Sequence, residues 1–227
     1  MHQHPHILVC MGSFDPVTRA HILLVEYAYD WLIRKGRHIT RILFSPVHDS
    51  YPYKHLAPSI HRVEMLRLAV AESKLSHIMD VDTMEVENPE GYQPTYVIVE
   101  NLRQRYTGAQ IYIVAGMDLL HSQCDETAWK PVNVQKLYSS AVAIIVPRDG
   151  GVGGISQRSV LNKVKQVPYL YEPYRNERIL ILNKSISKIS STAAKKELRH
   201  GSGSMCATSV QRYILNNSLY VADLSSQ

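Results

Sequence analysis

The sequence predicts an α/β protein with a Rossmann-like, doubly wound parallel sheet, because short apolar runs alternate along it with longer helical segments. We expect strands at residues 7–10, 39–45, 79–86, 110–115, 141–146 and 179–182. We expect helices at residues 20–35, 59–76, 95–105, 131–140, 156–166 and 206–216. Strands joined by helices of this length form βαβ units, whose sheet is covered by helices on both faces.

The first predicted strand runs into a glycine turn and then into a helix, with the sequence GSFDPVTRAH at residues 12–21. This arrangement aims backbone N–H groups and the positive end of the helix dipole at an anion, typically a phosphate. Thr18 and His21 stand three residues apart, so both side chains point toward whatever the turn holds. The alternative is an ordinary corner in which His21 is packed or solvated.

A second anion site is predicted where a helix begins near residue 190. Ser190, Ser191 or Thr192 can cap the first turn, and Lys195, Lys196 and Arg199 add positive charge close behind it. Taken alone, this pattern is also that of a routine amphipathic helix.

Residues 148–154 (RDGGVGG) form the one low-complexity stretch of the sequence. Glycine at this density after a strand predicts a flexible loop. A mobile lid and a plain linker are equally consistent with it.

The length of 227 residues suits one sizeable domain, so we treat 1–227 as a single domain. We expect residues 1–5 to be a flexible leader and residues 221–227 a flexible tail. The net charge of +5 is spread along the chain, which favours a phosphate pocket over a nucleic-acid surface.

Three cysteines at wide spacing, Cys10, Cys124 and Cys206, form neither a metal pattern nor a disulfide framework. A reducing compartment follows, so we expect the cytoplasm, with the nucleus as the alternative. No apolar run approaches the roughly 18 residues that a membrane span needs.

Together the two anion motifs resemble the ends of the ATP site in the nicotinamide/nicotinic acid mononucleotide adenylyltransferases, the eukaryotic-type branch of the nucleotidyltransferase superfamily. In that family GSFxPxTxxH lies near the start and ISSTxxR near the end, which match residues 12–21 and 189–195. Residues 45–63 resemble its SPVGDAYKKKGLIPAYHRV segment. Residues 81–83, 116–120 and 128–130 resemble its VDTWE, GADLL and LWK segments.

The resemblance implies a nucleotidyltransferase-type fold and the transfer of an adenylyl group from ATP to nicotinamide mononucleotide, nicotinic acid mononucleotide or both. The products would be NAD or deamido-NAD and pyrophosphate, formed by direct in-line attack without a covalent intermediate. It further implies Mg²⁺ held mainly by substrate phosphates and water, no protein-built metal site, and an oligomer of this chain. Neither a nucleic acid nor a membrane is expected as a partner.

The resemblance also implies the site residues. Its catalytic set is His21, Thr18 and Lys54. Its ATP-binding set is Gly12, Ser13, Phe14, His21, Ser191, Thr192, Lys195 and Arg199. Its mononucleotide-binding set is Lys54, Tyr51, Tyr92, Thr95, Gly116, Asp118, Trp129 and Arg148. His21 would donate to a phosphate of ATP, and Trp129 would stack on the pyridine ring.

Each assignment has a plainer alternative. Lys54 can be a solvated loop lysine, Trp129 a core residue, Asp118 a helix cap and Arg148 a surface arginine. The chain as a whole can be another adenylyl- or cytidylyltransferase of the superfamily, or a nucleotide-binding module that has lost turnover. The sequence does not separate a nicotinamide from a nicotinic acid substrate.

Three departures from the family pattern bear on these assignments. Lys195 stands where the family has arginine, which keeps the charge but loses the bidentate fork. Either Lys195 or Arg199, one turn on, would therefore hold a phosphate. Asp15 replaces the asparagine of the family's GSFNP, and the family's run of three lysines is reduced to Lys54.

Overall fold

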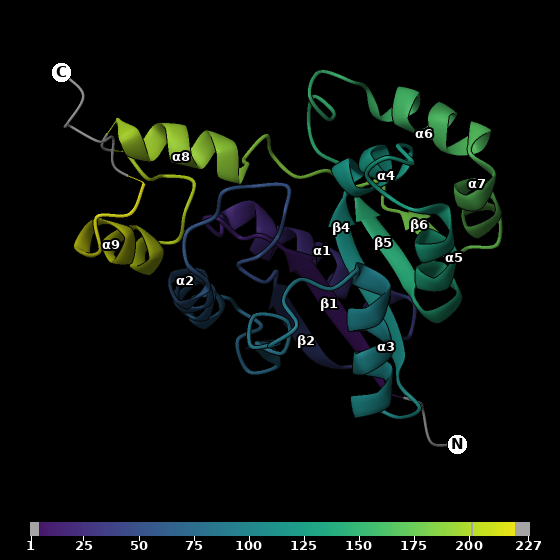
Figure 1. Cartoon of the computed structure of the whole chain (residues 1–227), viewed down its shortest axis with the longest axis horizontal. Coiled ribbons are helices and arrows are strands. Elements are labelled where there is room, and N and C mark those ends of the chain that lie inside the picture. Colours follow the sequence, from purple (N-terminus) through teal and green to yellow (C-terminus); the bar gives the residue numbers. More distant parts are fainter. Residues whose placement is uncertain (1–4, 201, 221–227) are drawn as a thin grey trace. The chain divides into compact units, whose positions relative to one another are not determined.

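The computed structural model describes residues 5–200 and 202–220, and it contains a six-stranded sheet. The strands are β1 (His6–Gly12), β2 (Ile39–Pro46), β3 (Met79–Val81), β4 (Gln110–Gly116), β5 (Val142–Val146) and β6 (Ile179–Ile181). Their order is β3-β2-β1-β4-β5-β6, so the chain winds outward from β1 in both directions (Figure 1). This is the strand order of a doubly wound, Rossmann-like fold, as predicted.

Along the chain, the helices up to residue 175 lie between strands, as expected of βαβ units, and the last two helices follow β6. The helices are α1 (Arg19–Arg34), α2 (Ser59–Ala71), α3 (Thr95–Arg105), α4 (Met117–Gln123), α5 (Pro131–Ser140), α6 (Gln157–Gln166), α7 (Pro168–Arg175), α8 (Ser191–Arg199) and α9 (Thr208–Asn216). None of the helices in the described part of the chain is long and apolar enough to cross a membrane.

Parallel pairing joins β1 to β4, β4 to β5 and β5 to β6. The register sets Ile7 opposite Ile111 and Ile113 opposite Ala143. Every residue of β5 is buried, as expected of a strand covered by helices on both faces.

The described chain divides into two compact units. Unit 1 comprises Met1–Met11, Leu24–Leu43 and Gln93–Lys188, and unit 2 comprises Gly12–Leu23, Phe44–Tyr92 and Ile189–Gln227. The single domain expected from the sequence stays a prediction. Of the expected leader and tail, only Pro5 belongs to the described residues, and it is exposed.

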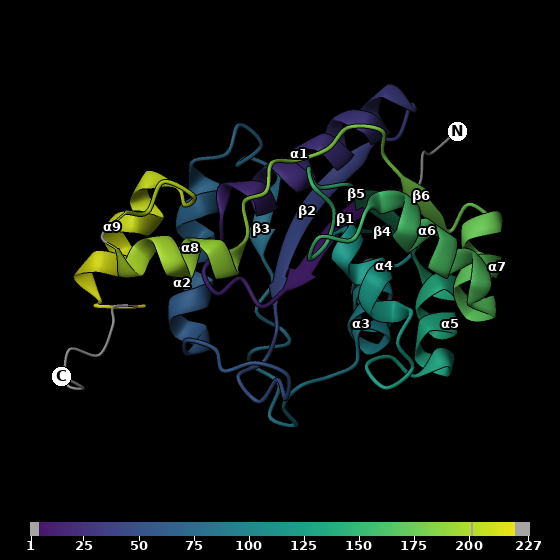
Figure 2. The same cartoon turned by 90° about the horizontal axis from the view of Figure 1, so that it is seen from above.

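The core of unit 1 is built by α4 to α7 around β5 and β6, which Figures 1 and 2 show beside one another. Ala143 and Ile145 alternate along β5 and face this cluster, as the two-residue period of a strand requires. Tyr138 and Tyr169 are buried in it, and their hydroxyls donate to the side chain and the backbone carbonyl of Gln123 at 2.7 and 2.9 Å. The buried phenols are thus satisfied.

In unit 2, α9 packs on α2 through polar contacts as well as apolar ones. The ring nitrogen Nδ1 of His61 lies 2.9 Å from the hydroxyl of Tyr213, and the backbone N–H of Ser209 donates to Glu72 at 2.8 Å. Glu197 near the end of α8 accepts from the segment that leads to α9, including the N–H of Met205 at 3.2 Å.

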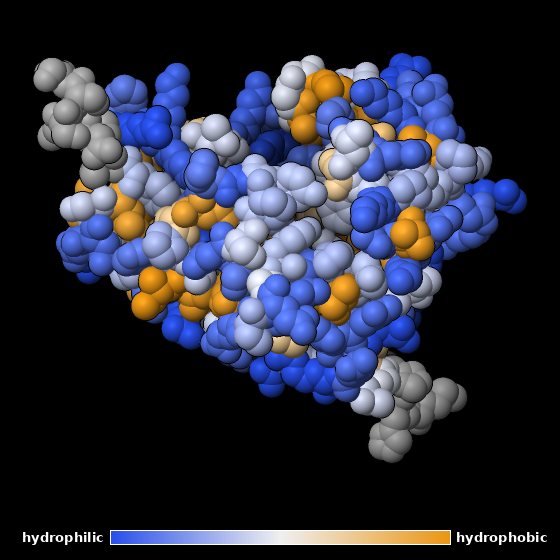
Figure 3. All heavy atoms as spheres, in the orientation of Figure 1, coloured by the Kyte–Doolittle hydropathy of each residue, from blue (hydrophilic) through white to orange (hydrophobic). Residues whose placement is uncertain are grey.

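On the face in Figure 3, apolar side chains are scattered among polar ones.

Two expected boundaries are wrong. The strand predicted at 79–86 ends at Val81, because Asp82 accepts from the N–H of Met84 at 3.3 Å and starts a turn. The helix predicted to reach residue 76 ends at Ala71, and Ser73 then accepts from the N–H of Leu75 at 3.1 Å. In both places a short polar side chain competes with the regular backbone pattern.

Two helices were not predicted. Helix α4 begins directly at the end of β4 and is only seven residues long, and the sole sign of it in the sequence was the alternative of Asp118 as a helix cap. Helix α7 carries Pro168 at its first position and Pro173 inside it, a composition that argues against a helix from sequence alone. Burial of Tyr169 and Leu170 in the core of unit 1 compensates for the proline.

Candidate functional site

The turn between β1 and α1 fixes the position and tautomer of His21. Nδ1 of the ring accepts a hydrogen bond from the backbone N–H of Thr18 at 3.0 Å and lies 2.8 Å from the Thr18 hydroxyl. Because Nδ1 accepts, a neutral imidazole carries its proton on Nε2, which is then the donor of the ring. The predicted pair of Thr18 and His21 is therefore brought together.

Phe14 is the buried aromatic residue of the same turn. Its ring is 1% exposed and packs edge-on against His21, with centroids 5.3 Å apart, and against Phe44, at 5.8 Å. Its backbone has a φ of +47°, which a bulky residue rarely adopts. A Cβ on Gly12 would lie 3.5 Å from the Phe14 ring, in ordinary contact, so space alone does not require glycine there. The structure thus assigns Phe14 a structural part in placing His21.

Asp15 is the buried charge of this turn, with 2% of its surface exposed. Oδ2 forms an ion pair with the ammonium of Lys195. Oδ1 accepts from the hydroxyl of Tyr220 at 2.5 Å and from the N–H of Ala57 at 3.2 Å. Three segments distant in sequence meet at this one carboxylate. Their hydrogen bonds and the ion pair offset the free-energy cost of burying its charge.

The second predicted anion motif is anchored to the first. Ser190 is the N-cap of α8 and accepts from the N–H of Ala193 at 3.1 Å, as predicted from its sequence. The Ser191 hydroxyl donates to the carbonyl of Pro16 at 2.9 Å, and Lys195 reaches Asp15. The start of α8 and the β1–α1 turn are therefore in direct contact within unit 2.

Arg62 on α2 is a central residue of this region that the sequence reasoning missed. Its side chain is fully buried. The guanidinium donates to the carbonyls of Ser13, Val47 and Ala57 at 2.8 to 3.0 Å and to Asp49 at 2.7 Å. The sequence signal that could have found it is an arginine on the otherwise apolar face of α2. A buried arginine needs hydrogen-bond acceptors, and such a position predicts them nearby.

Tyr51 and Tyr92, both predicted on the mononucleotide side, lie together in unit 2. Their ring centroids are 5.1 Å apart, and Tyr53 packs on Tyr51 at 5.2 Å. Burial, with the neighbouring tyrosines and Glu85, raises the pKa of Tyr92 to about 12. The phenol of Tyr92 therefore stays a neutral donor near neutral pH.

Three other predicted residues of unit 2 are exposed: Lys54 in the β2–α2 loop, and Thr192 and Arg199 on α8. Among the described residues, none offers Lys54 or Arg199 a hydrogen bond or an ion pair. Both cations are thus accessible to an anionic ligand, and the ammonium of Lys195 has one of its donors on Asp15.

Gly116 and Asp118 belong to unit 1, at the end of β4. Gly116 is the N-cap of α4 and Asp118 lies in its first turn, so the alternative of Asp118 as the N-cap is wrong. A Cβ on Gly116 would stand 2.3 Å from Oδ1 of Asp118, so the bare glycine makes room for that carboxylate. Burial and the charge of Asp118 raise the pKa of Cys10 to about 12.

Trp129 and Thr95 also lie in unit 1. The indole of Trp129 is half-buried against the core cluster, and its N–H donates to Ser122 at 3.2 Å. The ring is thus partly in the core and partly accessible, which leaves stacking a prediction. Thr95 begins α3 behind Pro94, at a carboxyl-side loop of the sheet.

Arg148 and the glycine stretch form a compact turn in unit 1. Arg148 forms an isolated bridge with Ile186, while Val152 pairs with Ile155 in both directions, at 2.9 and 2.8 Å. Val152 and Ile155 pack against the core cluster. Gly151 has a φ of +76°, and a Cβ there would meet the Ile155 carbonyl at 2.0 Å. This packing fits neither a lid nor a plain linker.

The residues present fit a metal ion that arrives with the nucleotide. Within the described residues, no three side chains of histidine, cysteine, aspartate or glutamate gather to hold a metal. Asp15, the buried carboxylate of the turn, has both oxygens engaged. That Mg²⁺ is held mainly by phosphate oxygens and water stays a prediction.

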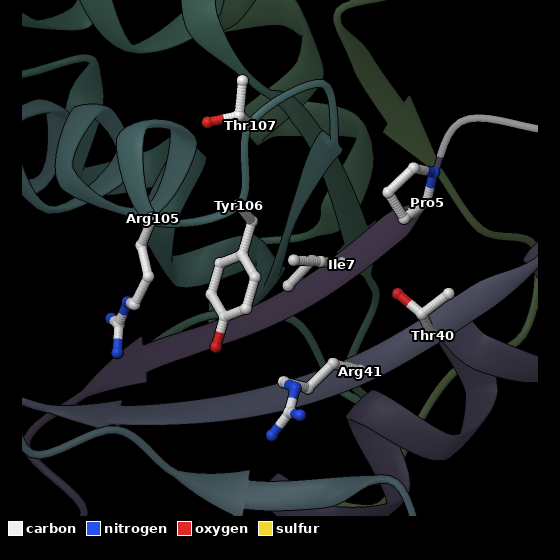
Figure 4. A pocket seen from close by; sticks show the side chains of 7 residues that line it. All are labelled: Pro5, Ile7, Thr40, Arg41, Arg105, Tyr106 and Thr107. Atoms are coloured by element: carbon white, nitrogen blue, oxygen red, sulfur yellow. The ribbon is translucent and has the colours of Figure 1, made fainter.

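A cavity of about 410 Å³ in unit 1 is lined by none of the predicted site residues. Arg41, Arg105 and Tyr106 line it beside Ile7 at the beginnings of β1 and β2 (Figure 4). Ligands of doubly wound sheets bind at the opposite, carboxyl ends of the strands. This cavity is therefore not the candidate site.

The fold and the paired phosphate motifs define a nucleotidyltransferase class of protein, and the comparisons agree. The profile of the family described as "Cytidylyltransferase-like" matches residues 9–197. The chain belongs to this family.

Individual relatives are similar to this chain over most of its length. Nicotinamide/nicotinic acid mononucleotide adenylyltransferase 1 of Saccharomyces cerevisiae is 30% identical over 96% of this chain, which spans 56% of that relative's length. The Arabidopsis thaliana enzyme of the same name is 27% identical, over 86% of this chain and 80% of its own. The resemblance predicted from the sequence is thus confirmed.

Solved structures share the fold. Nicotinic acid mononucleotide adenylyltransferase of Plasmodium falciparum, complexed with APC, superposes with a TM-score of 0.67 at 22% identity, covering 96% of this chain and 98% of its own. At this identity the match supports the fold alone.

Proposed function

We propose that this protein transfers the adenylyl group of ATP to the 5′-phosphate of nicotinamide mononucleotide, nicotinic acid mononucleotide or both. The observation that carries the proposal is the contact of Ser191 with the Pro16 carbonyl, which joins the two phosphate-binding motifs. Relatives from yeast and Arabidopsis, named for this activity, support the choice of substrates.

In the proposed reaction, an oxygen of the mononucleotide 5′-phosphate attacks the α-phosphorus of ATP. The bond from that phosphorus to the oxygen bridging the β-phosphate breaks, and pyrophosphate leaves. His21 donates from Nε2 to the α- or β-phosphate, held in position by the Thr18 N–H on its other nitrogen. Backbone N–H groups after Gly12 and at the start of α8 add positive potential, and Lys54 binds the mononucleotide phosphate.

Mg²⁺ bound to the triphosphate would neutralise part of its charge. We also propose a reducing compartment, cytoplasmic or nuclear, because Cys10, Cys124 and Cys206 carry free thiols. An oligomer of this chain is proposed from the family resemblance alone.

The test measures pyrophosphate release and dinucleotide formation from ATP and Mg²⁺, with each mononucleotide added separately. His21→Ala should lower kcat by about 10²- to 10³-fold, the usual effect of losing one donor to the reacting phosphates. His77→Ala, at an exposed histidine beyond α2, serves as the control and should leave kcat unchanged.

Two outcomes contradict the proposal. Pyrophosphate release with CTP but not with ATP would indicate cytidylyl transfer. No release with either nucleotide, in a protein that binds ATP, would indicate a binding module without turnover.

A further inference from the structure

Two departures from the family motifs, Asp15 and Lys195, are in direct contact. Their ion pair joins the β1–α1 turn to the second turn of α8, across 180 positions of sequence. The Asp15 side chain is 2% exposed and that of Lys195 is 29% exposed. The carboxylate is therefore buried while the ammonium still reaches the surface.

The remaining contacts of Asp15 hold the pair rigidly. Oδ1 accepts from Tyr220 and from the N–H of Ala57, so both oxygens of the carboxylate are engaged and its position is fixed. The Tyr220 ring also lies 5.4 Å from the Lys195 ammonium, at cation–π distance. Burial and the hydrogen bond to Asp15 raise the pKa of Tyr220, so the phenol stays a donor.

An ammonium has three donors, and Asp15 takes one from Lys195. A free lysine head moves on a stem of four carbons, and binding a phosphate would cost its rotamer freedom. In this protein the Asp15 carboxylate and the Tyr220 ring already restrict the Lys195 side chain, so it loses less rotamer freedom when a phosphate binds. The other donors remain for a ligand at the start of α8.

We propose that Asp15 is a positioning residue for ATP, which fixes the Lys195 ammonium so that its remaining donors meet the triphosphate. The inference rests on the proposed function for the identity of the nucleotide. An arginine at position 195 would instead offer its planar fork to both oxygens of Asp15, in competition with Tyr220, and turn away from the nucleotide. Asp15 and Lys195 thus form a matched pair.

The experiment is a double-mutant cycle of Asp15→Asn, Lys195→Arg and the two together. ATP binding with Mg²⁺ and no mononucleotide is measured by titration calorimetry, and KM for ATP and kcat by pyrophosphate release. Each single variant should weaken ATP binding and raise KM about tenfold, the value of one charge-assisted hydrogen bond, with kcat within about threefold. The double variant should return to within about threefold of the original protein.

Effects that multiply in the double variant, or an Asp15→Asn protein that binds ATP as tightly as the original, would overturn the proposal. Lys165→Gln, at an exposed lysine of α6 in unit 1, is the control and should leave ATP binding unchanged. Should Asp15→Asn fail to fold, Tyr220→Phe keeps the ring and removes one hydrogen bond to Asp15. It should weaken ATP binding about threefold, and no change there counts against the proposal.

The binding measurement separates the two hypotheses. A protein that binds ATP but forms no dinucleotide contradicts the proposed function, while the calorimetric cycle still decides the part of Asp15.

Discussion

Arg62 organises unit 2 around one guanidinium. It donates to three backbone carbonyls that belong to the β1–α1 turn and to the β2–α2 loop, and it pairs with Asp49. Those loops have no regular secondary structure, so the guanidinium supplies donors that a backbone ladder would otherwise supply. Arg62 acts on the candidate site through Ser13, which it holds in place.

Replacing Arg62 by methionine should destabilise the protein by at least about 3 kcal/mol, because three backbone carbonyls and the Asp49 carboxylate lose their donor at once. Urea unfolding followed by circular dichroism measures the change. Arg67→Met is the control, at an arginine of the same helix whose side chain is 58% exposed, and should change stability by less than about 0.5 kcal/mol. Equal losses in the two variants would show that burial of the guanidinium is unimportant.

Asp49 should contribute a pH-dependent part of the stability. Burial acts to raise its pKa, but hydrogen bonds from Ser59 and the pair with Arg62 outweigh it and lower the pKa below the ordinary 3.8. A lowered folded-state pKa means that the contribution is present above about pH 4 and is lost as the pH falls through the folded value. Asp49→Asn should therefore cost more stability at pH 7 than at pH 3.

Unfolding free energies of both proteins at the two pH values test this, with Glu100→Gln, at an exposed glutamate of α3, as the control. A difference between Asp49→Asn and the original protein that is the same at pH 3 and pH 7 would contradict the assignment.

At the scale of elements, the glycine turn of residues 150–154 shows why a composition signal is ambiguous. Glycines at positive φ allow a tight reversal, and two apolar residues of that reversal, Val152 and Ile155, are carried onto the core of unit 1. Flexible loops and tight turns both need glycine. Packing of the apolar residues decides between them.

Gly151→Ala and Gly153→Ala should differ in their effect on stability. Both glycines have positive φ, which costs an alanine about 1 kcal/mol. At Gly153 nothing lies within 4 Å of the added Cβ, whereas at Gly151 it would meet the Ile155 carbonyl at 2.0 Å. We expect a loss of about 1 kcal/mol for Gly153→Ala and two or more times that for Gly151→Ala, measured by thermal unfolding. Equal losses would mean that the turn is open in solution.

At the scale of the molecule, the predicted ligand residues divide between the two units. The whole ATP-binding set lies in unit 2, together with Tyr51, Lys54 and Tyr92. Thr95, Gly116, Asp118, Trp129 and Arg148 lie in unit 1. Each substrate should therefore leave its own pattern of protection on the chain.

Hydrogen exchange should resolve that pattern. ATP with Mg²⁺ should slow amide exchange in Gly12–Leu23 and at the start of α8, and leave the segment around Trp129 unchanged. A mononucleotide analogue that cannot react, added next, should slow exchange at Trp129 and change the fluorescence of its indole. In a Trp129→Phe variant the remaining fluorescence comes from Trp31 and should not change. Protection by ATP confined to unit 1 would contradict the assignment.

Much of the fold could be predicted from the sequence, because its strands are nearly continuous apolar runs and its helices have a regular apolar period. Helices α3 and α5 begin and end where the pattern predicts, and Ser190 and Ser156 cap α8 and α6. Local side-chain chemistry sets these features, and local chemistry is what a sequence displays. Helix α7 escaped prediction because its stability comes from burial of Tyr169 and Leu170, not from its proline-containing sequence.

The sequence by itself determined the doubly wound fold class, the family, and the two phosphate motifs with Thr18 and His21 at their centre. Only the tertiary structure decided what holds those motifs: Arg62 under the turn, and Asp15 joined to Lys195 and Tyr220. The physical reason is range. Apolar periodicity and capping act within a few residues, whereas the partner of a buried charge is chosen by the folded chain, here across as many as 205 positions.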